Sequence, residues 1–230
     1  MTIDTNDLLN SILGSLSRID YVKPDALPNI DLYMDQVTTF MDQQLASTKR
    51  YDEDKILTKT MINNYAKNDL LPPPVKKKYS KEHILMLIFI YYFKNILSIS
   101  DIQKILNPLS EKYFGNAGDF NLEKIYNEVF QLEKTEIHLL QEDIAEKFKT
   151  SQDTFQMLEG EDKEAMQMFA FICLLSFDVY IKKQLIEKLI DACSVKSAEK
   201  TKQAKQKNPE DGKQGKQKNP EDGKNKKKEN

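Results

Sequence analysis

The chain is poor in the residues that build most catalytic and metal sites. Its 230 residues include only two histidines and two cysteines. Cys173 and Cys193 fit neither a disulfide framework nor a Cys-x-x-Cys metal site. His83 and His138 have no companions that would indicate a catalytic triad or a metal set. Cys173 lies in the run MFAFICLLSF, which predicts a small, buried hydrophobic residue.

Phosphate-binding motifs are also missing. The sequence has neither a Gly-x-Gly-x-x-Gly pattern nor a Walker loop of the form Gly-x-x-x-x-Gly-Lys-Ser/Thr. Acidic pairs such as Glu161-Asp162 are ordinary charges at a helix start. We therefore expect a protein that is not an enzyme and that uses no cofactor and no metal.

Long apolar runs are scarce. Residues 84–93 and 166–181 are strongly apolar, but both fall short of the roughly 20 residues that a bilayer core requires. The first residues, MTIDTNDLL, lack the basic and apolar regions of a signal peptide. These features predict buried helices in a soluble, cytoplasmic protein.

Charge is unevenly distributed, although the formal net charge is only −2. Residues 55–81 hold seven lysines against one acid, Asp69, and residues 197–230 hold eleven lysines against six acids. The remainder of the chain is acidic. A basic island on an acidic body indicates an anionic partner, and a solvated lysine face is the alternative.

Hydrophobic spacing of three and four residues predicts a mostly α fold. Thr58 or Thr60 is a suitable cap for a short helix over 59–69, and Ser80 for a helix over 81–97. Ser100 with Gln103 suits a further helix that ends before Pro108. Only the lysine loop could form a short hairpin. Other helices are expected at 1–20, 32–46, 122–148 and 162–192.

The last segment differs from the rest. KQKNPEDGK occurs twice, at 205–213 and 216–224, with no large apolar residue. Such a composition predicts disorder over 197–230. The segment is either a nonspecific polyanion-binding tail or a solubilising tail without a partner.

Residues 57–106 carry a resemblance to a known family. MINNYAKNDLL, at 61–71, is followed by Pro72-Pro73-Pro74, by KKKYS at 76–80, by a long helix and by a short Ser/Leu-led helix. This order resembles the MerR-type winged helix-turn-helix regulators of bacteria. The resemblance implies a MerR-like module with a small wing over 31–108. An N-terminal helix and linker (1–30) precede it, and an all-helical C-terminal domain (119–196) follows.

The chain departs from that family's pattern at three places. Asn63 stands where the family has a phosphate-binding arginine, and Asp69 replaces a glycine. The loop before Thr58 is longer and more acidic than the family's tight turn. The whole chain therefore looks like an uncharacterised bacterial family that carries a divergent version of the module.

The resemblance implies binding to double-stranded DNA, with helix 59–69 in the major groove and the lysine wing, 75–79, on phosphates. Asparagine can bond adenine through N6 and N7, whereas lysine contacts to phosphate carry no sequence information. Ile62 and Tyr65 are expected on the packed face. Tyr79 is either a phosphate donor or a hydrophobic pin under the wing. The candidate DNA-binding residues are Lys59, Thr60, Asn63, Asn64, Lys67, Lys76, Lys77, Lys78 and Tyr79.

The sequence thus predicts a transcription regulator that forms a homodimer through its C-terminal helices and reads two half-sites. One alternative is a helical protein-interaction module that keeps the winged-helix scaffold without binding DNA. Another is a small-molecule sensor built from Met168, Phe169, Phe171 and Phe177. Residues at that spacing are more often core or dimer interface than pocket.

Overall fold

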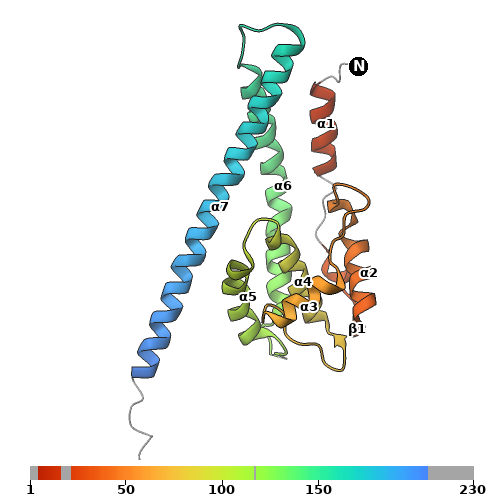
Figure 1. Cartoon of the computed structure of the whole chain (residues 1–230), viewed down its shortest axis with the longest axis vertical. Helices are drawn as coiled ribbons and strands as arrows, with labels where there is room; N and C mark the ends of the chain where they lie inside the picture. Colours follow the sequence, from red (N-terminus) through yellow and green to blue (C-terminus); the bar gives the residue numbers. More distant parts are fainter. Residues whose placement is uncertain (1–4, 17–21, 117, 207–230) are drawn as a thin grey trace, which may run out of the picture. The chain divides into compact units, whose positions relative to one another are not determined.

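The computed structural model describes residues 5–16, 22–116 and 118–206, which are mostly helical (Figure 1). The expected mostly α fold is confirmed. The chain divides into two compact units, one ending at Ile190 and the other beginning at Asp191. The elements are α1 (Thr5–Leu16), η1 (Pro24–Ala26), β1 (Leu32–Tyr33), α2 (Met34–Gln44), η2 (Ala46–Thr48), α3 (Lys59–Lys67), β2 (Lys78–Tyr79), α4 (Lys81–Lys94), α5 (Ile99–Tyr113), α6 (Leu122–Gln152) and α7 (Gly160–Gln206).

The α4 helix is the centre of the larger core. Its sequence, KEHILMLIFIYYFK, is apolar on every side, and a helix of that kind must be buried. The five residues from Ile84 to Ile88 all have 0% of their surface exposed. Core residues of α2, α3, α5 and α6 surround it. The prediction of a buried helix over 84–93 is confirmed.

Two hydrophobic clusters share the α6 helix. The larger one begins at Val22 and includes Tyr126 on α6, and the Tyr126 hydroxyl donates a hydrogen bond to the carbonyl of Val22. The smaller cluster contains Ile144 and Phe148 of α6 with Phe171 of α7, and α1 packs against it. One continuous helix therefore links both clusters.

Helix caps follow the sequence with one correction. The Thr58 hydroxyl accepts a hydrogen bond from the Met61 amide at 3.2 Å, as expected for the start of α3. For α5 the cap is Ser98 rather than Ser100, because the Ser98 hydroxyl accepts from the Asp101 amide at 3.2 Å. α5 also continues through Pro108 to Tyr113, so the boundary expected at residue 108 lies inside a helix.

The only strands among the described residues, β1 and β2, are antiparallel, with Leu32 opposite Tyr79 and Tyr33 opposite Lys78. β1 occupies positions that the sequence pattern assigned to a helix over 32–46. Val75 pairs with Lys78 through two backbone hydrogen bonds of 3.1 and 2.9 Å, which close a tight hairpin. The expected hairpin in the lysine loop is present, and β1 attaches it to the start of α2.

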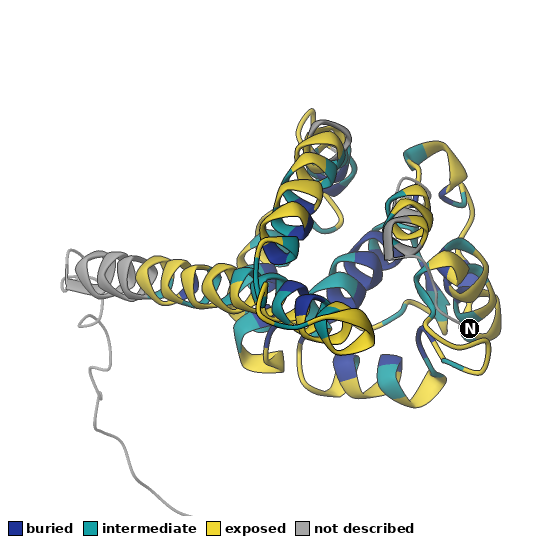
Figure 2. Ribbon diagram, turned by 90° about the horizontal axis from the view of Figure 1, so that it is seen from above, coloured by how far each residue is buried: buried dark blue, intermediate teal, exposed yellow. Residues whose placement is uncertain are grey.

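The α7 helix differs most from expectation. It runs from 160 to 206, beyond the predicted end at 192, and up to residue 194 it is largely exposed (Figure 2). Phe169, Phe177 and Cys173 are exposed, so the prediction of a buried Cys173 was wrong. The stretch from Gly160 to Ser194 is long and apolar enough to cross a membrane by length and composition alone. The predicted disordered segment, 197–230, starts inside this helix, and residues 207–230 lie outside the described residues.

α3 ends in a Schellman motif. The Leu70 amide donates to the Tyr65 carbonyl at 2.9 Å, and the Asp69 amide to the Ala66 carbonyl at 3.4 Å. Asp69 has a φ of 53°, the left-handed conformation that glycine adopts without steric cost. The backbone at residue 69 therefore has a conformation that suits glycine better than aspartate.

We expect Asp69→Gly to raise the free energy of unfolding by about 0.5–1 kcal/mol, because glycine relieves the strain of a side chain at positive φ. Urea denaturation would measure the change. Asp69→Ala is the matched control: it also removes the charge but keeps a Cβ, and it should not stabilise. Equal stabilisation by both variants would assign the effect to charge instead.

Candidate nucleic-acid interface

The outer face of α3 carries the polar residues that the sequence predicted. Ile62 and Tyr65 are buried, at 0% and 7% exposure, and fix the orientation of the helix on the core. The other face is exposed, as expected from the helical spacing. Its exposed residues are Lys59, Thr60, Asn63, Asn64 and Lys67.

The hairpin after the triple proline holds two exposed lysines at its tip. Lys76 and Lys77 have φ values of 50° and 65°. Two-residue hairpin turns of this kind prefer Asn-Gly, because both central residues need positive φ. Lysine there costs roughly 1–2 kcal/mol per residue. Strained residues often mark functional positions. Here the strained turn places the side chains of both lysines at the exposed tip.

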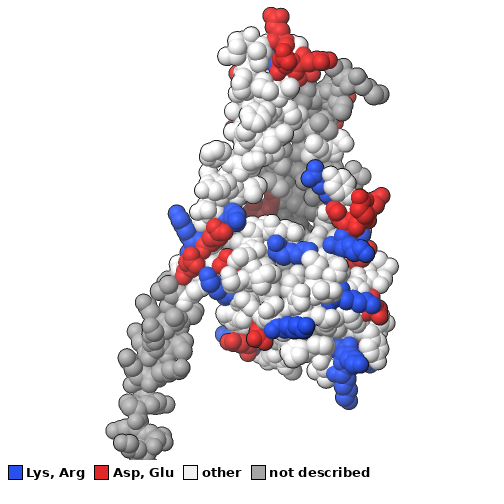
Figure 3. All heavy atoms as spheres, viewed as in Figure 1, with Lys and Arg blue, Asp and Glu red and all other residues white. Residues whose placement is uncertain are grey.

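α3 and the hairpin lie on the same face of the larger core. In Figure 1 α3 lies toward the viewer, and the chain that follows it runs below it to β2. Figure 3, drawn from the same side, shows several lysine or arginine side chains over this region with a few acidic groups among them. In this view the side of the core that carries α3 therefore shows more basic than acidic groups.

Three candidate residues have partners within the chain. Lys59 forms an ion pair with Asp35 at the start of α2. The Lys78 ammonium lies 5.3 Å from the centre of the Tyr33 ring, within cation–π range. Tyr79 is only 3% exposed, and burial raises the pKa of its phenol above 10. Of the two roles considered for Tyr79, the structure supports the hydrophobic pin and removes it from the surface available to phosphate.

His83 fixes the hairpin to the core. It is 2% exposed, and its ring makes edge contacts with Tyr79, at 5.4 Å between centroids, and Phe114, at 4.7 Å. Its Nδ1 accepts the Ser80 backbone amide at 3.0 Å, which completes a capping box at the start of α4. The sequence contains this signal as Ser-x-x-His, with histidine at the position where a capping box usually has Glu or Gln.

The hydrogen bond to Nδ1 requires a neutral ring with its proton on Nε2. Nε2 is buried and makes no hydrogen bond to any described residue. Burial lowers the pKa of His83, and the nearby carbonyls of Pro73 and Pro72 and the charge of Asp31 oppose that shift. Protonation would place a charge in the core and would remove the acceptor that caps α4.

The long loop before α3 is tied to α4. The Lys94 ammonium donates to the Ile56 carbonyl at 2.9 Å and lies 4.9 Å from the Tyr91 ring centre. Burial lowers the pKa of Lys94. The Tyr91 hydroxyl in turn shares a hydrogen bond with Thr48. These contacts define the position of the loop.

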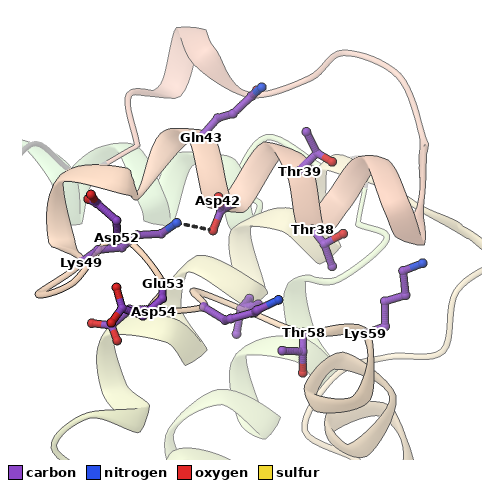
Figure 4. A pocket seen from close by; sticks show the side chains of 12 residues that line it. Thr38, Thr39, Asp42, Gln43, Lys49, Asp52, Glu53, Asp54, Thr58 and Lys59 are labelled. Atoms are coloured by element: carbon purple, nitrogen blue, oxygen red, sulfur yellow. Dashed lines mark ion pairs between the residues drawn. The ribbon is translucent and has the colours of Figure 1, made fainter.

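An open groove of about 810 Å³ separates α2 from this loop and reaches the first residues of α3. Figure 4 shows Asp42 of α2 paired with Lys49, at 2.8 Å, while Asp52 and Glu53 extend from the loop. The Asp54 carboxylate accepts hydrogen bonds from the backbone amides of Arg50 and Tyr51, at 3.2 and 3.0 Å. The groove therefore neutralises much of its own charge, and its exposed acids Asp52 and Glu53 lie at the end away from Lys59 (Figure 4).

The sequence comparisons cover this interface. Residues 22–129 match a family model described as a domain of unknown function, DUF1836. This match spans 108 of the 230 residues, a little less than half of the chain. It extends from Val22 to the first turns of α6 and contains all of the candidate residues. No curated protein and no solved structure matches the chain. The expectation of an uncharacterised family is confirmed to this extent.

We expect the DUF1836 domain to lose stability as the pH falls from 7 toward 5. The pKa of His83 is lower in the folded chain than the unfolded value of 6.5, so the unfolded state binds a proton more readily below that pH. His83→Gln keeps a side-chain acceptor at the third helical position but cannot titrate. Urea midpoints at several pH values should fall less steeply for His83→Gln. Parallel curves for the two proteins would show that His83 is not the group responsible.

Proposed function

We propose that the protein is a cytoplasmic transcription regulator that binds double-stranded DNA through a divergent MerR-like winged helix-turn-helix. α3 enters the major groove, and the lysine hairpin lies on the adjacent phosphates. The observation that carries this proposal is the common face of α3 and the strained Lys76-Lys77 tip. A homodimer through the C-terminal helices, reading two half-sites, is part of the proposal.

The order of elements supports this reading. A short strand precedes α2, α3 follows, and the hairpin returns to pair with the strand before α4 begins. Strand, helix, helix and hairpin is the arrangement of a winged helix-turn-helix with its wing attached to the first strand. The resemblance noted in the sequence omitted β1, so this agreement is independent of it.

The exposed residues supply two kinds of contact to DNA: hydrogen bonds to bases and charge for phosphates. Asn63 and Asn64 can each offer a carboxamide to adenine, while Lys67 and the hairpin lysines supply charge. With Lys59 held by Asp35 and Lys78 over the ring of Tyr33, the lysines left for phosphate are Lys67, Lys76 and Lys77. Three such contacts give a slope of log affinity against log salt concentration near −3.

A protein-interaction module without DNA binding is the second candidate. The ion pair between Lys59 and Asp35 favours this alternative because it lowers the positive potential at the start of α3. The two functions differ in one measurable property: a protein-binding module shows no salt-dependent affinity for duplex DNA.

We expect Lys76→Gln with Lys77→Gln to weaken binding to the DNA upstream of the protein's own gene and to reduce the salt slope by about 2, because two phosphate contacts are lost. Mobility shifts at a series of salt concentrations give both quantities. The matched control is Lys149→Gln with Lys188→Gln, which removes the same charge from α6 and α7. Equal effects of the two double variants, or no salt-sensitive binding by the wild type, would remove the DNA-binding proposal.

We expect Asn64→Ala and Asn63→Ala each to affect base preference rather than overall affinity. Loss of a bidentate contact to adenine costs about 1–3 kcal/mol of discrimination. Binding to unrelated duplex should stay the same, since asparagine carries no charge. Selection from a randomised duplex pool, repeated with each variant, would measure the preference at every base. If both variants select the same sequence as the wild type, α3 does not read the bases.

A further inference from the structure

The small sheet formed by β1 and β2 has an inner and an outer face. Residues directly opposite each other on antiparallel strands project to the same side, and successive residues alternate between the two sides. Leu32 and Tyr79 are one such pair, and both are buried, at 7% and 3% exposure. Tyr33 and Lys78 are the next pair, so their side chains lie on the outer face, away from the core.

Val75 extends this outer face across the hairpin. It pairs with Lys78 through two backbone hydrogen bonds, so its side chain projects to the same side as that lysine. Val75 is 70% exposed and Tyr33 is 53% exposed. Tyr33, Lys78 and Val75 therefore form a row, here called the outer row, in which a lysine lies between two exposed apolar groups.

The ring of Tyr33 has a defined position in the outer row. The Lys78 ammonium lies 5.3 Å from the centre of this ring, within cation–π range. The Tyr33 backbone amide donates to the side chain of Gln36 at 2.8 Å, which fixes the main chain at the start of α2. An aromatic side chain with two rotatable bonds loses little entropy on binding. The ring is therefore a preformed apolar surface next to the charged tip of the hairpin.

The charges around the outer row favour an anionic partner. The hairpin carries three lysines, at 76–78, and the acids that flank β1 are Asp31 and Asp35. Asp35 is paired with Lys59, so the lysines outnumber the acid that remains. The backbone of DNA carries phosphates separated by the apolar carbons of deoxyribose. It thus matches exposed apolar groups that lie beside ammonium groups.

We propose that Tyr33 and Val75 pack on the sugar–phosphate backbone of the duplex that α3 reads. This proposal rests on the proposed function and extends its DNA surface from the lysine tip to β1. Contacts to the backbone position a protein without reading sequence. An apolar contact releases no counterions, so its contribution to affinity does not weaken with salt as that of a lysine contact does.

Tyr33→Ala should weaken binding about tenfold, both to the DNA upstream of the protein's own gene and to unrelated duplex, because the apolar area of the ring is no longer buried. This loss should not shrink as the salt concentration rises, whereas the loss caused by Lys76→Gln with Lys77→Gln should shrink. Tyr33→Phe keeps the ring and should keep most of the affinity. Val75→Thr places a hydroxyl in the contact and should weaken binding about threefold. Mobility shifts at several salt concentrations measure these effects, and circular dichroism checks that each variant is folded.

Tyr51→Ala is the matched control. Tyr51 is 54% exposed and has Arg50 at 5.3 Å from its ring centre, so it resembles Tyr33 in exposure and in its cation–π contact but lies in the loop before α3. Equal losses for Tyr33→Ala and Tyr51→Ala would overturn the proposal.

The same measurements separate this proposal from DNA binding itself. If the wild type binds duplex in a salt-sensitive manner and Tyr33→Ala binds equally well, the outer row does not contact DNA, although the proposed function stands. If the wild type does not bind duplex at all, both proposals are wrong. If Tyr33→Ala keeps its affinity for DNA but has a lower mass than the wild type in light scattering, the outer row contacts a second copy of the chain instead.

Discussion

The burial of α4 is the constraint on which the rest of the structure depends. Five consecutive residues without exposed surface leave this helix no solvent side, so other elements must cover it all round. Full burial of one such side chain stabilises a fold by about 1.5–3 kcal/mol. α3 and the hairpin are two of these covering elements. Their inward faces are apolar because they cover α4, and their outward faces are polar because they meet solvent.

The junction between the hairpin and α4 shows how core and surface are coupled. His83 belongs to the first turn of α4, yet it touches Tyr79 of the hairpin and Phe114 beyond α5. The two lysines at the tip adopt a backbone that glycine and asparagine prefer, and the contacts of Tyr79 stabilise that backbone from below. Burial of Tyr79 therefore helps to offset the backbone strain at the two lysines.

Much of the DUF1836 domain could be predicted from local pattern. Thr58, Ile62 and Tyr65 set the cap and the inner face of α3, and each is a short-range signal. β1 was missed because its two residues gain strand pairing only from β2, which lies far away in sequence. Both Ser98 and Ser100 are plausible caps for α5 from the sequence, and in the structure the Ser98 hydroxyl accepts the Asp101 amide.

The candidate site was predicted less completely. The outward set on α3 followed from helical spacing, whereas the ion pair of Lys59 with Asp35 and the burial of Tyr79 depend on tertiary contacts. The composition of α7 predicted a buried helix, but in the single chain many of its apolar side chains are exposed. Periodicity identifies an apolar face but does not reveal which molecule covers it.

The sharing of α6 by both hydrophobic clusters has a mechanical consequence. Tyr126 anchors the helix in the larger cluster and Ile144 in the smaller one, about 27 Å away along a continuous helix at 1.5 Å per residue. Because the helix is continuous, a small tilt of α6 at the smaller cluster would also move its end in the larger cluster. The hydroxyl of Tyr126 is bonded to Val22, so such a movement would reach the first residue of the larger core.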